Sequence, residues 1–146
     1  MESNNVIVEF EALPVNQGFA RSVVSAYCAA GDPTVEELTE IKTAVSEAVS
    51  NAIIHGYEKK GVGKIRMELR MIDKDKVFVR ITDYGKGIPD IKKAMEPMYS
   101  TEEDNEMSGM GFTVMESFSD KVMVESQPGE GTSITLIKYL DTYYGL

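Results

Sequence analysis

The sequence predicts a single α+β domain, and three segments carry that prediction. Residues 64–72 and 76–82 alternate apolar and polar side chains over short runs, which is typical of two antiparallel strands in a hairpin. From Thr34 onward, apolar residues recur at helical spacing, so we expect one long amphipathic helix. Residues 120–126 and 132–139 repeat the strand pattern and are expected to close the sheet.

Length and charge narrow the class of protein. The 146 residues, of which 42% are apolar, suffice for one hydrophobic core, and we find no repeat or linker, so residues 1–146 are expected to form one domain. The formal net charge of −9 argues against a nucleic-acid partner, whose phosphates attract Lys and Arg. It favours partners with basic surfaces, although moderate acidity also simply aids solubility.

Several other classes are disfavoured. No apolar run approaches the roughly 18 residues needed to cross a bilayer, and the first five residues lack the pattern of a signal peptide. We therefore expect a cytoplasmic protein that does not bind membranes. Cys28 is the only cysteine and His55 the only histidine, which argues against an internal disulfide and against a Cys/His zinc site.

The N-terminal part is expected to form a strand and a helix. Residues 5–12 have the strand pattern, with Pro14 ending a strand near a sheet edge. Residues 15–30 are expected to be helical up to Gly31, with one apolar face formed by Phe19, Val23, Ala26 and Tyr27. Arg21 lies away from that face and, taken alone, is expected to be a solvated charge.

The long helix carries the first candidate site. Asp32 or Thr34 is expected to cap its start and Gly56 to stop it. Its apolar stripe consists of Leu38, Ile41, Val45, Ala48, Val49 and Ala52. Glu47 and Asn51 on the other face are four residues apart, so they project to one spot and can hold a metal ion and activate a hydroxyl. The alternative is a polar pair that faces water.

A second candidate site follows the strand at 76–82. The next residues, Asp83-Tyr84-Gly85-Lys86-Gly87-Ile88-Pro89, place a carboxylate and two glycines in a loop. Glycine allows close approach of another group to the backbone, so this loop is suited to a small polar ligand. An ordinary turn is the alternative on this spacing alone.

A third candidate site is a glycine-rich entry to a helix. A short helix is expected near residues 90–95, followed by a polar loop over 96–108. Ser108-Gly109-Met110-Gly111 then leads into a helix over 112–118. Free backbone N–H groups at a helix start can cradle a phosphate, although a flexible helix entry gives the same pattern.

Taken together, these segments resemble the GHKL ATPase superfamily, whose members share the Bergerat ATP-binding fold, over nearly the whole chain. Closer similarity is to the small anti-sigma factor serine kinases of spore-forming bacteria, seen in residues 38–57 and 108–116. The resemblance implies a mixed, mostly antiparallel sheet with helices packed on one face. It also implies that ATP is held between the long helix, the sheet and a lid, which is the polar loop over 96–108.

The resemblance assigns a role to each motif residue. Asp83 would accept a hydrogen bond from the adenine amino group, and Thr132 would support that contact through a water molecule. Asn51 would coordinate Mg²⁺, and Glu47 would be the general base that polarises a serine hydroxyl or positions a water. Gly85 and Gly87 would let the backbone approach the nucleotide, and Gly109 and Gly111 would supply N–H donors to phosphate. Ser108 would also bind the nucleotide.

The resemblance also implies partners. Family members dimerise and bind a sigma factor through an arginine of the first helix, and Arg21 matches that arginine. We therefore expect a sporulation sigma factor and an anti-anti-sigma protein as partners, and a homodimer. The implied reaction is ATP-dependent phosphorylation of a serine of the anti-anti-sigma protein.

One departure from the family leaves the activity open. Related proteins carry an arginine just before Ser-Gly-Met-Gly, where this chain has Met107, and no Lys or Arg occurs between Lys93 and Lys121. An arginine near a transferring phosphoryl group can be worth ~10³-fold in rate. The alternatives are therefore a serine kinase, an ATP-gated sequestering protein with little transfer, and a detached histidine-kinase catalytic domain.

Overall fold

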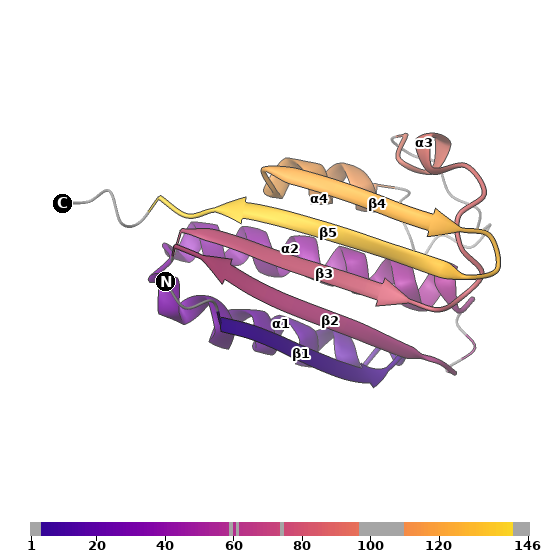
Figure 1. The fold of residues 1–146 in the computed structure, drawn as a ribbon, viewed down its shortest axis with the longest axis horizontal. Helices are drawn as coiled ribbons and strands as arrows, with labels where there is room; N and C mark the ends of the chain where they lie inside the picture. The colour runs from indigo at the N-terminus through magenta and orange to yellow at the C-terminus, as the bar shows by residue number, and fades with distance from the viewer. Residues whose placement is uncertain (1–3, 59, 61, 74, 97–109, 142–146) are drawn as a thin grey trace.

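The computed structural model describes residues 4–58, 60, 62–73, 75–96 and 110–141, which form a two-layer α+β structure (Figure 1). One layer is a five-stranded sheet, and α1, α2 and α4 cover one of its faces. In chain order the elements are β1 (Asn4–Glu11), α1 (Asn16–Cys28), a 3-10 turn (Ala29–Gly31), α2 (Val35–Asn51), a π-helical turn (Ala52–Gly56), β2 (Lys64–Ile72), β3 (Lys76–Asp83), α3 (Ile91–Ala94), α4 (Gly111–Phe118), β4 (Lys121–Gln127) and β5 (Gly131–Tyr139).

The order of the strands confirms the α+β prediction and corrects one detail of it. The strands lie in the order β1-β2-β3-β5-β4, with β1 at an edge as expected. All four described strand pairs are antiparallel, whereas we expected a mixed, mostly antiparallel sheet. In this register Asp83 at the end of β3 faces Thr132 at the start of β5, so two predicted site residues meet.

Helix α2 packs on the sheet along its length, because its continuous apolar stripe can be buried only against other apolar residues. Ile41, Val45, Ala48 and Val49 are buried in the core, as the sequence predicts. The start of the helix is a capping box, in which the Thr34 hydroxyl accepts from the Glu37 N–H and the Glu37 carboxylate accepts from the Thr34 N–H. Asp32 is not the cap, because its φ of 51° places it in the left-handed region.

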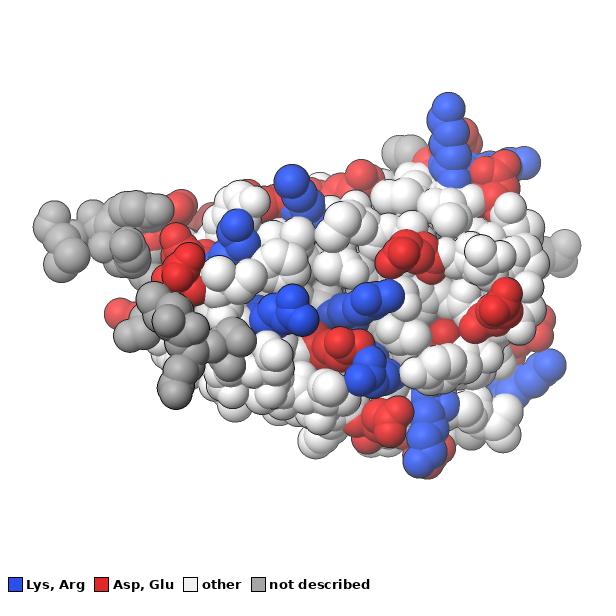
Figure 2. All heavy atoms as spheres, viewed as in Figure 1, with Lys and Arg blue, Asp and Glu red and all other residues white. Residues whose placement is uncertain are grey.

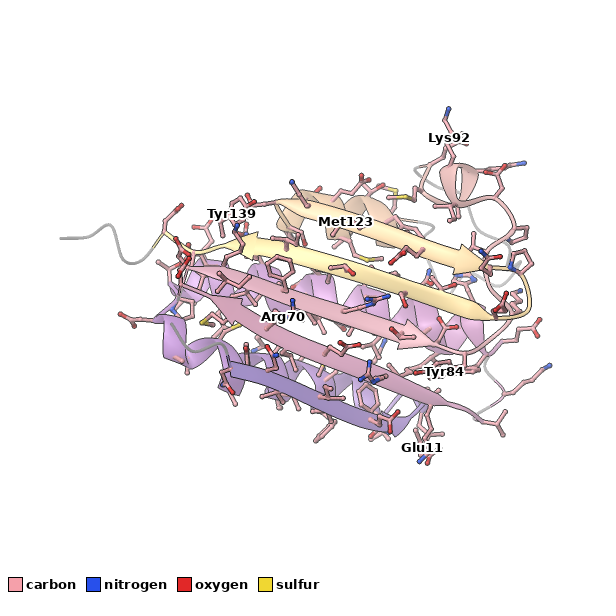
Figure 3. All side chains as sticks on the ribbon, viewed as in Figure 1. Glu11, Arg70, Tyr84, Lys92, Met123 and Tyr139 are labelled. Atoms are coloured by element: carbon pink, nitrogen blue, oxygen red, sulfur yellow. The ribbon has the colours of Figure 1, made fainter. Side chains whose placement is uncertain are left out.

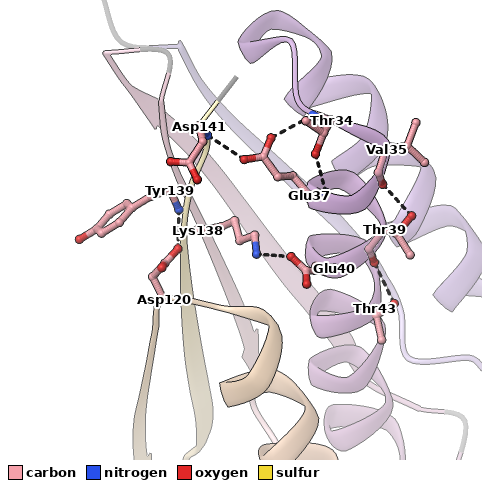
Figure 4. Close-up of polar contacts among 10 residues, drawn as sticks. All are labelled: Thr34, Val35, Glu37, Thr39, Glu40, Thr43, Asp120, Lys138, Tyr139 and Asp141. Atoms are coloured by element: carbon pink, nitrogen blue, oxygen red, sulfur yellow. Dashed lines mark hydrogen bonds and ion pairs between the residues drawn. The ribbon is translucent and has the colours of Figure 1, made fainter. Parts of the chain in front are cut away.

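Two polar contacts tie the start of α2 to the end of β5 (Figure 4). The Lys138 ammonium group lies 2.7 Å from the Glu40 carboxylate, and the side chains are only 12% and 26% exposed. Glu37 also accepts from the Asp141 N–H at 2.7 Å. Because the Lys138–Glu40 pair is partly shielded from water, it fixes the position of α2 along the sheet better than a surface ion pair would.

The buried face of α1 differs from the predicted one. Its buried residues are Ala20, Val24, Tyr27 and Cys28, so of the four predicted residues only Tyr27 is buried. Phe19 is 47% exposed and instead packs against Phe10 in an edge-to-face arrangement, with 5.8 Å between the two ring centroids. The small side chains of Ala20 and Cys28 let α1 approach α2 and the sheet closely. The spacing of the large apolar residues, on which the prediction was based, did not reveal this face.

None of the described helices covers the other face of the sheet, which carries interleaved charges (Figure 2). Arg66 pairs with Glu68, and Arg80 lies 3.4 Å from Glu125. Figure 3 shows side chains such as Arg70, Met123 and Tyr139 on this face. Within the described part of the chain, no helix is long and apolar enough to span a bilayer.

The capping box gives a test of the fold. Thr34→Ala removes one of its two hydrogen bonds, so we expect the free energy of unfolding in urea to fall by about 1 kcal/mol. Thr39→Ala is the matched control, because its hydroxyl only bonds to the Val35 carbonyl within the exposed helix surface. It should cost little, since Ala favours helix. Equal losses in the two variants would contradict a special role for Thr34.

Candidate functional site

Asp83 is a buried carboxylate at the end of β3, with only 3% of its surface exposed. It accepts a hydrogen bond from the Gly85 N–H at 2.9 Å. Burial raises the pKa of Asp83 to about 6, although the N–H groups of Gly85 and Thr132 act in the opposite direction. An ionised carboxylate has more lone pairs than these two donors use, so Asp83 can still accept a hydrogen bond from a ligand.

The turn after α2 lies directly against this carboxylate. The π-helical turn ends at Gly56, and a Cβ there would stand 2.7 Å from the Asp83 carboxyl carbon. The Gly56 carbonyl also accepts from the Lys86 N–H at 3.0 Å. We predicted Gly56 only as a helix stop, whereas its lack of a side chain also lets the π-helical turn after α2 pack against Asp83.

The glycines of the loop serve contacts within the protein. A Cβ on Gly85 would stand 2.0 Å from the Gly56 carbonyl oxygen, and one on Gly87 would stand 2.1 Å from the Gln127 carbonyl oxygen. Gly87 also has a φ of 78°, which side chains rarely adopt. We expected these glycines to admit a nucleotide, and the described structure shows a further reason for them: they let three backbone segments pack together.

Thr132 belongs to a hydroxyl network that sequence reasoning missed. Its side-chain oxygen lies 2.8 Å from the Ser126 hydroxyl oxygen, and Ser126 accepts from the Ile88 N–H at 2.7 Å. Ser126 thereby ties the loop after Asp83 to β4. The sequence did contain a signal, because Ser126 follows Val122 and Val124 in the alternation that points toward the helices.

Glu47 and Asn51 share one side of α2, as their spacing predicts. Both side chains are half-buried, and burial raises the pKa of Glu47. The start of α4 lies beside Glu47, since a Cβ on Gly111 would stand 3.3 Å from Glu47 Oε1. The structure therefore brings together Glu47 and Gly111, the last residue of the glycine-rich helix entry, although they are 64 residues apart in the chain.

The oxygen donors at this site suit a magnesium ion that is held mostly by phosphates and water and only partly by the protein. Among the described residues there is no cluster of three or more His, Cys, Asp or Glu side chains that could hold a metal. The Asn51 amide oxygen at the end of α2 is a hard donor of the kind that Mg²⁺ prefers. Mg²⁺ commonly takes one or two protein ligands and completes its shell with phosphates and water, so this site fits the expected ion.

Arg21 is less solvated than its sequence context suggests. Its guanidinium donates a hydrogen bond from Nη1 to the Ser46 hydroxyl at 3.0 Å, and the residue is half-buried. The bond places Arg21 beside the residue that precedes Glu47 on α2. Ser108, Gly109 and Met107 lie outside the described residues, so the predictions for them stay predictions.

Comparison with known proteins establishes the class to which this fold belongs. A family model described as the histidine kinase-like ATPase domain matches residues 10–138. The structure of the RsbU and RsbW domains of Rv1364c from Mycobacterium tuberculosis superposes with a TM-score of 0.69 at 18% identity, covering 94% of this chain and 32% of that one. The mycobacterial sensor histidine kinase MprB gives 0.57 at 17% identity, covering 92% and 98%. At these identities the likeness concerns the fold.

Much closer relatives identify the family. The anti-sigma F factor of Clostridium botulinum strain Eklund 17B is 50% identical over 138 residues, covering 94% of this chain and 96% of that protein. The anti-sigma F factor of Bacillus licheniformis is 49% identical over 137 residues, covering 94% and 93%. The chain therefore belongs to the anti-sigma F factor family of histidine kinase-like ATPase domains, as the resemblance in its motifs predicted.

The raised pKa of Asp83 gives a test of the site. In the unfolded chain its pKa is near the ordinary 3.8, so the folded state binds the proton more tightly. Stability from this group is therefore present below pH 4 and is lost as the pH rises through about 6. The loss is at most about 3 kcal/mol, at 1.36 kcal/mol per pH unit of pKa difference.

The measurement is the free energy of unfolding of wild type and of Asp83→Asn in urea from pH 4 to pH 7. Asn does not titrate, so the difference between the two proteins isolates the carboxyl group. We expect wild type to lose stability relative to Asp83→Asn as the pH rises. A difference that stays constant across this range would show that the carboxylate is not desolvated.

Proposed function

We propose that this protein is an anti-sigma factor that binds a sporulation sigma factor and uses Mg-ATP to phosphorylate a serine of an anti-anti-sigma protein. The observation that carries the proposal is the position of Glu47. It is a half-buried carboxylate beside Gly111 at the start of α4, on the same helix as Asn51. A base, a metal-binding amide and a phosphate-binding helix entry are the parts that phosphoryl transfer needs.

In this proposal the adenine ring binds at Asp83. The carboxylate accepts a hydrogen bond from the exocyclic amino group, and Thr132 contributes through a bridging water. The backbones of Gly85 and Gly87 shape the wall of this subsite. Burial favours such recognition because a missing partner for a buried carboxylate is costly, so a base without a donor at that position is rejected.

The phosphates lie toward α4. Backbone N–H groups of Ser108, Gly109 and Gly111 donate to their oxygens, and the positive end of the α4 dipole adds to this attraction. Asn51 holds Mg²⁺, which supplies charge neutralisation of the phosphate oxygens when it is bound.

Glu47 acts on the acceptor serine. The raised pKa of its carboxylate makes it a better proton acceptor than an exposed glutamate. As the serine oxygen bonds to the γ-phosphorus, the bond from that phosphorus to the β–γ bridging oxygen breaks. The products are phosphoserine and ADP, and the serine proton passes to Glu47.

The partners follow from the family. The names of the close relatives support a sigma factor as the inhibited partner. We propose Arg21 as a residue that contacts this partner, and the cytoplasm as the compartment. We also propose that the chain forms a homodimer. The hydrogen bond from Arg21 to Ser46 holds the arginine on the surface of α2, where a partner would meet both α1 and α2.

One observation favours a second function, that of an ATP-gated sequestering protein with little phosphate transfer. Between Lys93 and Lys121 the chain has five acidic residues before α4 and no Lys or Arg. Negative charge near a triphosphate opposes its binding and leaves the developing charge of the transition state without a basic partner. In this alternative, nucleotide binding at Asp83 and Asn51 would gate the sigma factor, and Glu47 would have no catalytic use.

The first test is the intact mass of the anti-anti-sigma protein after incubation with this protein and Mg-ATP. We expect wild type to add one phosphate. Glu47→Gln should lower the rate by about 10²- to 10⁴-fold, because the base is lost, and should leave the dissociation constant for ATP nearly unchanged.

The matched control is Glu36→Gln, because Glu36 is an exposed residue in the first turn of the same helix. It should transfer phosphate at the wild-type rate. If wild type binds ATP and adds no mass to the partner, the sequestering function is correct and the kinase is wrong.

A second test concerns the position before the glycine-rich entry. Met107→Arg restores the basic residue of related proteins, and an arginine there would stabilise charge on the transferring phosphoryl group. We expect turnover to rise by about tenfold or more, measured as phosphoserine formed per minute. Met107→Gln is the control for a polar residue without charge. Equal turnover in all three proteins would show that the missing arginine does not limit the rate.

A further inference from the structure

Tyr57, the residue after the π-helical turn, occupies an unusual position between two strands. Its phenol oxygen accepts a hydrogen bond from the Tyr84 N–H at 2.7 Å and donates one to the Lys64 carbonyl at 2.6 Å. Lys64 is the first residue of β2, and Tyr84 is the first residue after β3. One hydroxyl group therefore bridges the two strands where the candidate site begins.

The strand register shows what this bridge replaces. Ile65 faces Asp83 in the last described pair of β2 and β3, so the next pair in sequence would be Lys64 and Tyr84. At that position the backbone donor and acceptor do not bond to each other, because both bond to the phenol of Tyr57. The hydroxyl thus ends the ladder in a defined way while keeping both backbone groups satisfied.

The ring of Tyr57 is itself held firmly. A Cβ on Gly63 would stand 2.5 Å from a ring carbon, so the ring packs flush against the backbone just before β2. Burial raises the pKa of the Tyr57 phenol, and the charge of nearby Asp83 raises it further. The phenol therefore stays protonated at neutral pH and remains a donor to the Lys64 carbonyl.

The bridge bears on Asp83 through the chain that follows it. Tyr84 lies between Asp83 and Gly85, and the Gly85 N–H donates to the Asp83 carboxylate at 2.9 Å. Gly85 in turn packs against the Gly56 carbonyl, which belongs to the residue before Tyr57. Residues 56 and 57 thus contact residues 84 and 85 at two adjacent points, directly after Asp83 in the chain.

We propose that Tyr57 is a positioning residue for base recognition, whose hydroxyl group aims the Asp83 carboxylate at the amino group of adenine. This inference rests on the proposed binding of ATP and adds to it a residue that makes no contact with the nucleotide. The consequence is specific: loss of the hydroxyl weakens recognition of the base and leaves the phosphate contacts intact.

The test is Tyr57→Phe, which keeps the ring on Gly63 and removes only the oxygen atom. Isothermal titration calorimetry gives dissociation constants for Mg-ATP, Mg-GTP and Mg-tripolyphosphate. We expect the dissociation constant for ATP to rise about tenfold, which corresponds to loss of the hydrogen bond between the adenine amino group and Asp83. The constants for GTP and tripolyphosphate should change less than twofold. The preference for ATP over GTP should therefore fall about tenfold.

Tyr139→Phe is the matched control, because Tyr139 is exposed at the far end of β5 and its ring packs near Lys76. It should bind all three ligands as wild type does. An unchanged preference for ATP in Tyr57→Phe would overturn the inference. Equal weakening for ATP and tripolyphosphate would also overturn it, since the role would then be general support of the fold.

A readout without nucleotide separates this inference from the proposed function. The pKa of the Asp83 carboxyl group can be followed by NMR in the free protein, and we expect its midpoint near pH 6 to move in Tyr57→Phe. If wild type fails to bind ATP but the midpoint moves, the proposed function is wrong and the structural link from Tyr57 to Asp83 stands. If ATP binds and the midpoint does not move, the link itself is wrong.

Discussion

The contact between Gly56 and Asp83 is the constraint on which the rest of the site depends. A buried carboxylate at the end of a strand is costly unless its surroundings supply donors and exclude clashes. Here the absence of a side chain on Gly56 makes room for the carboxyl group, and the Gly56 carbonyl accepts from Lys86 in the following loop. Since the π-helical turn that ends at Gly56 directly continues α2, which carries Glu47 and Asn51, this one contact would relate the proposed base subsite to the proposed phosphate subsite.

The opposite end of α2 is fixed by polar contacts instead of by close packing. The Glu37 contact to Asp141 and the Glu40–Lys138 pair hold the helix start against the end of β5, and the capping box at Thr34 fixes the first turn itself (Figure 4). A helix held at both ends keeps its side chains in register with the sheet. That matters for phosphoryl transfer, because positioning supplies most of the catalysis and a displacement of about 1 Å can cost 10²-fold.

The sequence predicted the elements well and the contacts between them poorly. The hairpin at 64–72 and 76–82 and the helix from Thr34 were found because long periodic patterns report which face is buried. The face of α1 was wrong, since small residues such as Ala20 form it and carry little signal. Ser126 and Tyr57 were missed for another reason: each acts through a side-chain bond to a backbone group distant in sequence. The alternation of β4 places Ser126 on the helix side of the sheet, but no spacing rule reveals which backbone group it meets.

The described site residues, in the loop after β3 and on α2, offer few positive charges to a bound nucleotide. Of the residues in the loop from Asp83 to Pro89, only Lys86 is basic, and its ammonium group lies 3.6 Å from Glu58 on the exposed surface. In the proposed function, α2 would offer the phosphates an amide and a carboxylate, and the chain as a whole carries −9. The charge of a bound triphosphate would therefore have to be balanced by backbone N–H groups, the dipole of α4 and a divalent cation. On this proposal, binding of the phosphates would depend strongly on the cation, whereas recognition of the base at Asp83 would not.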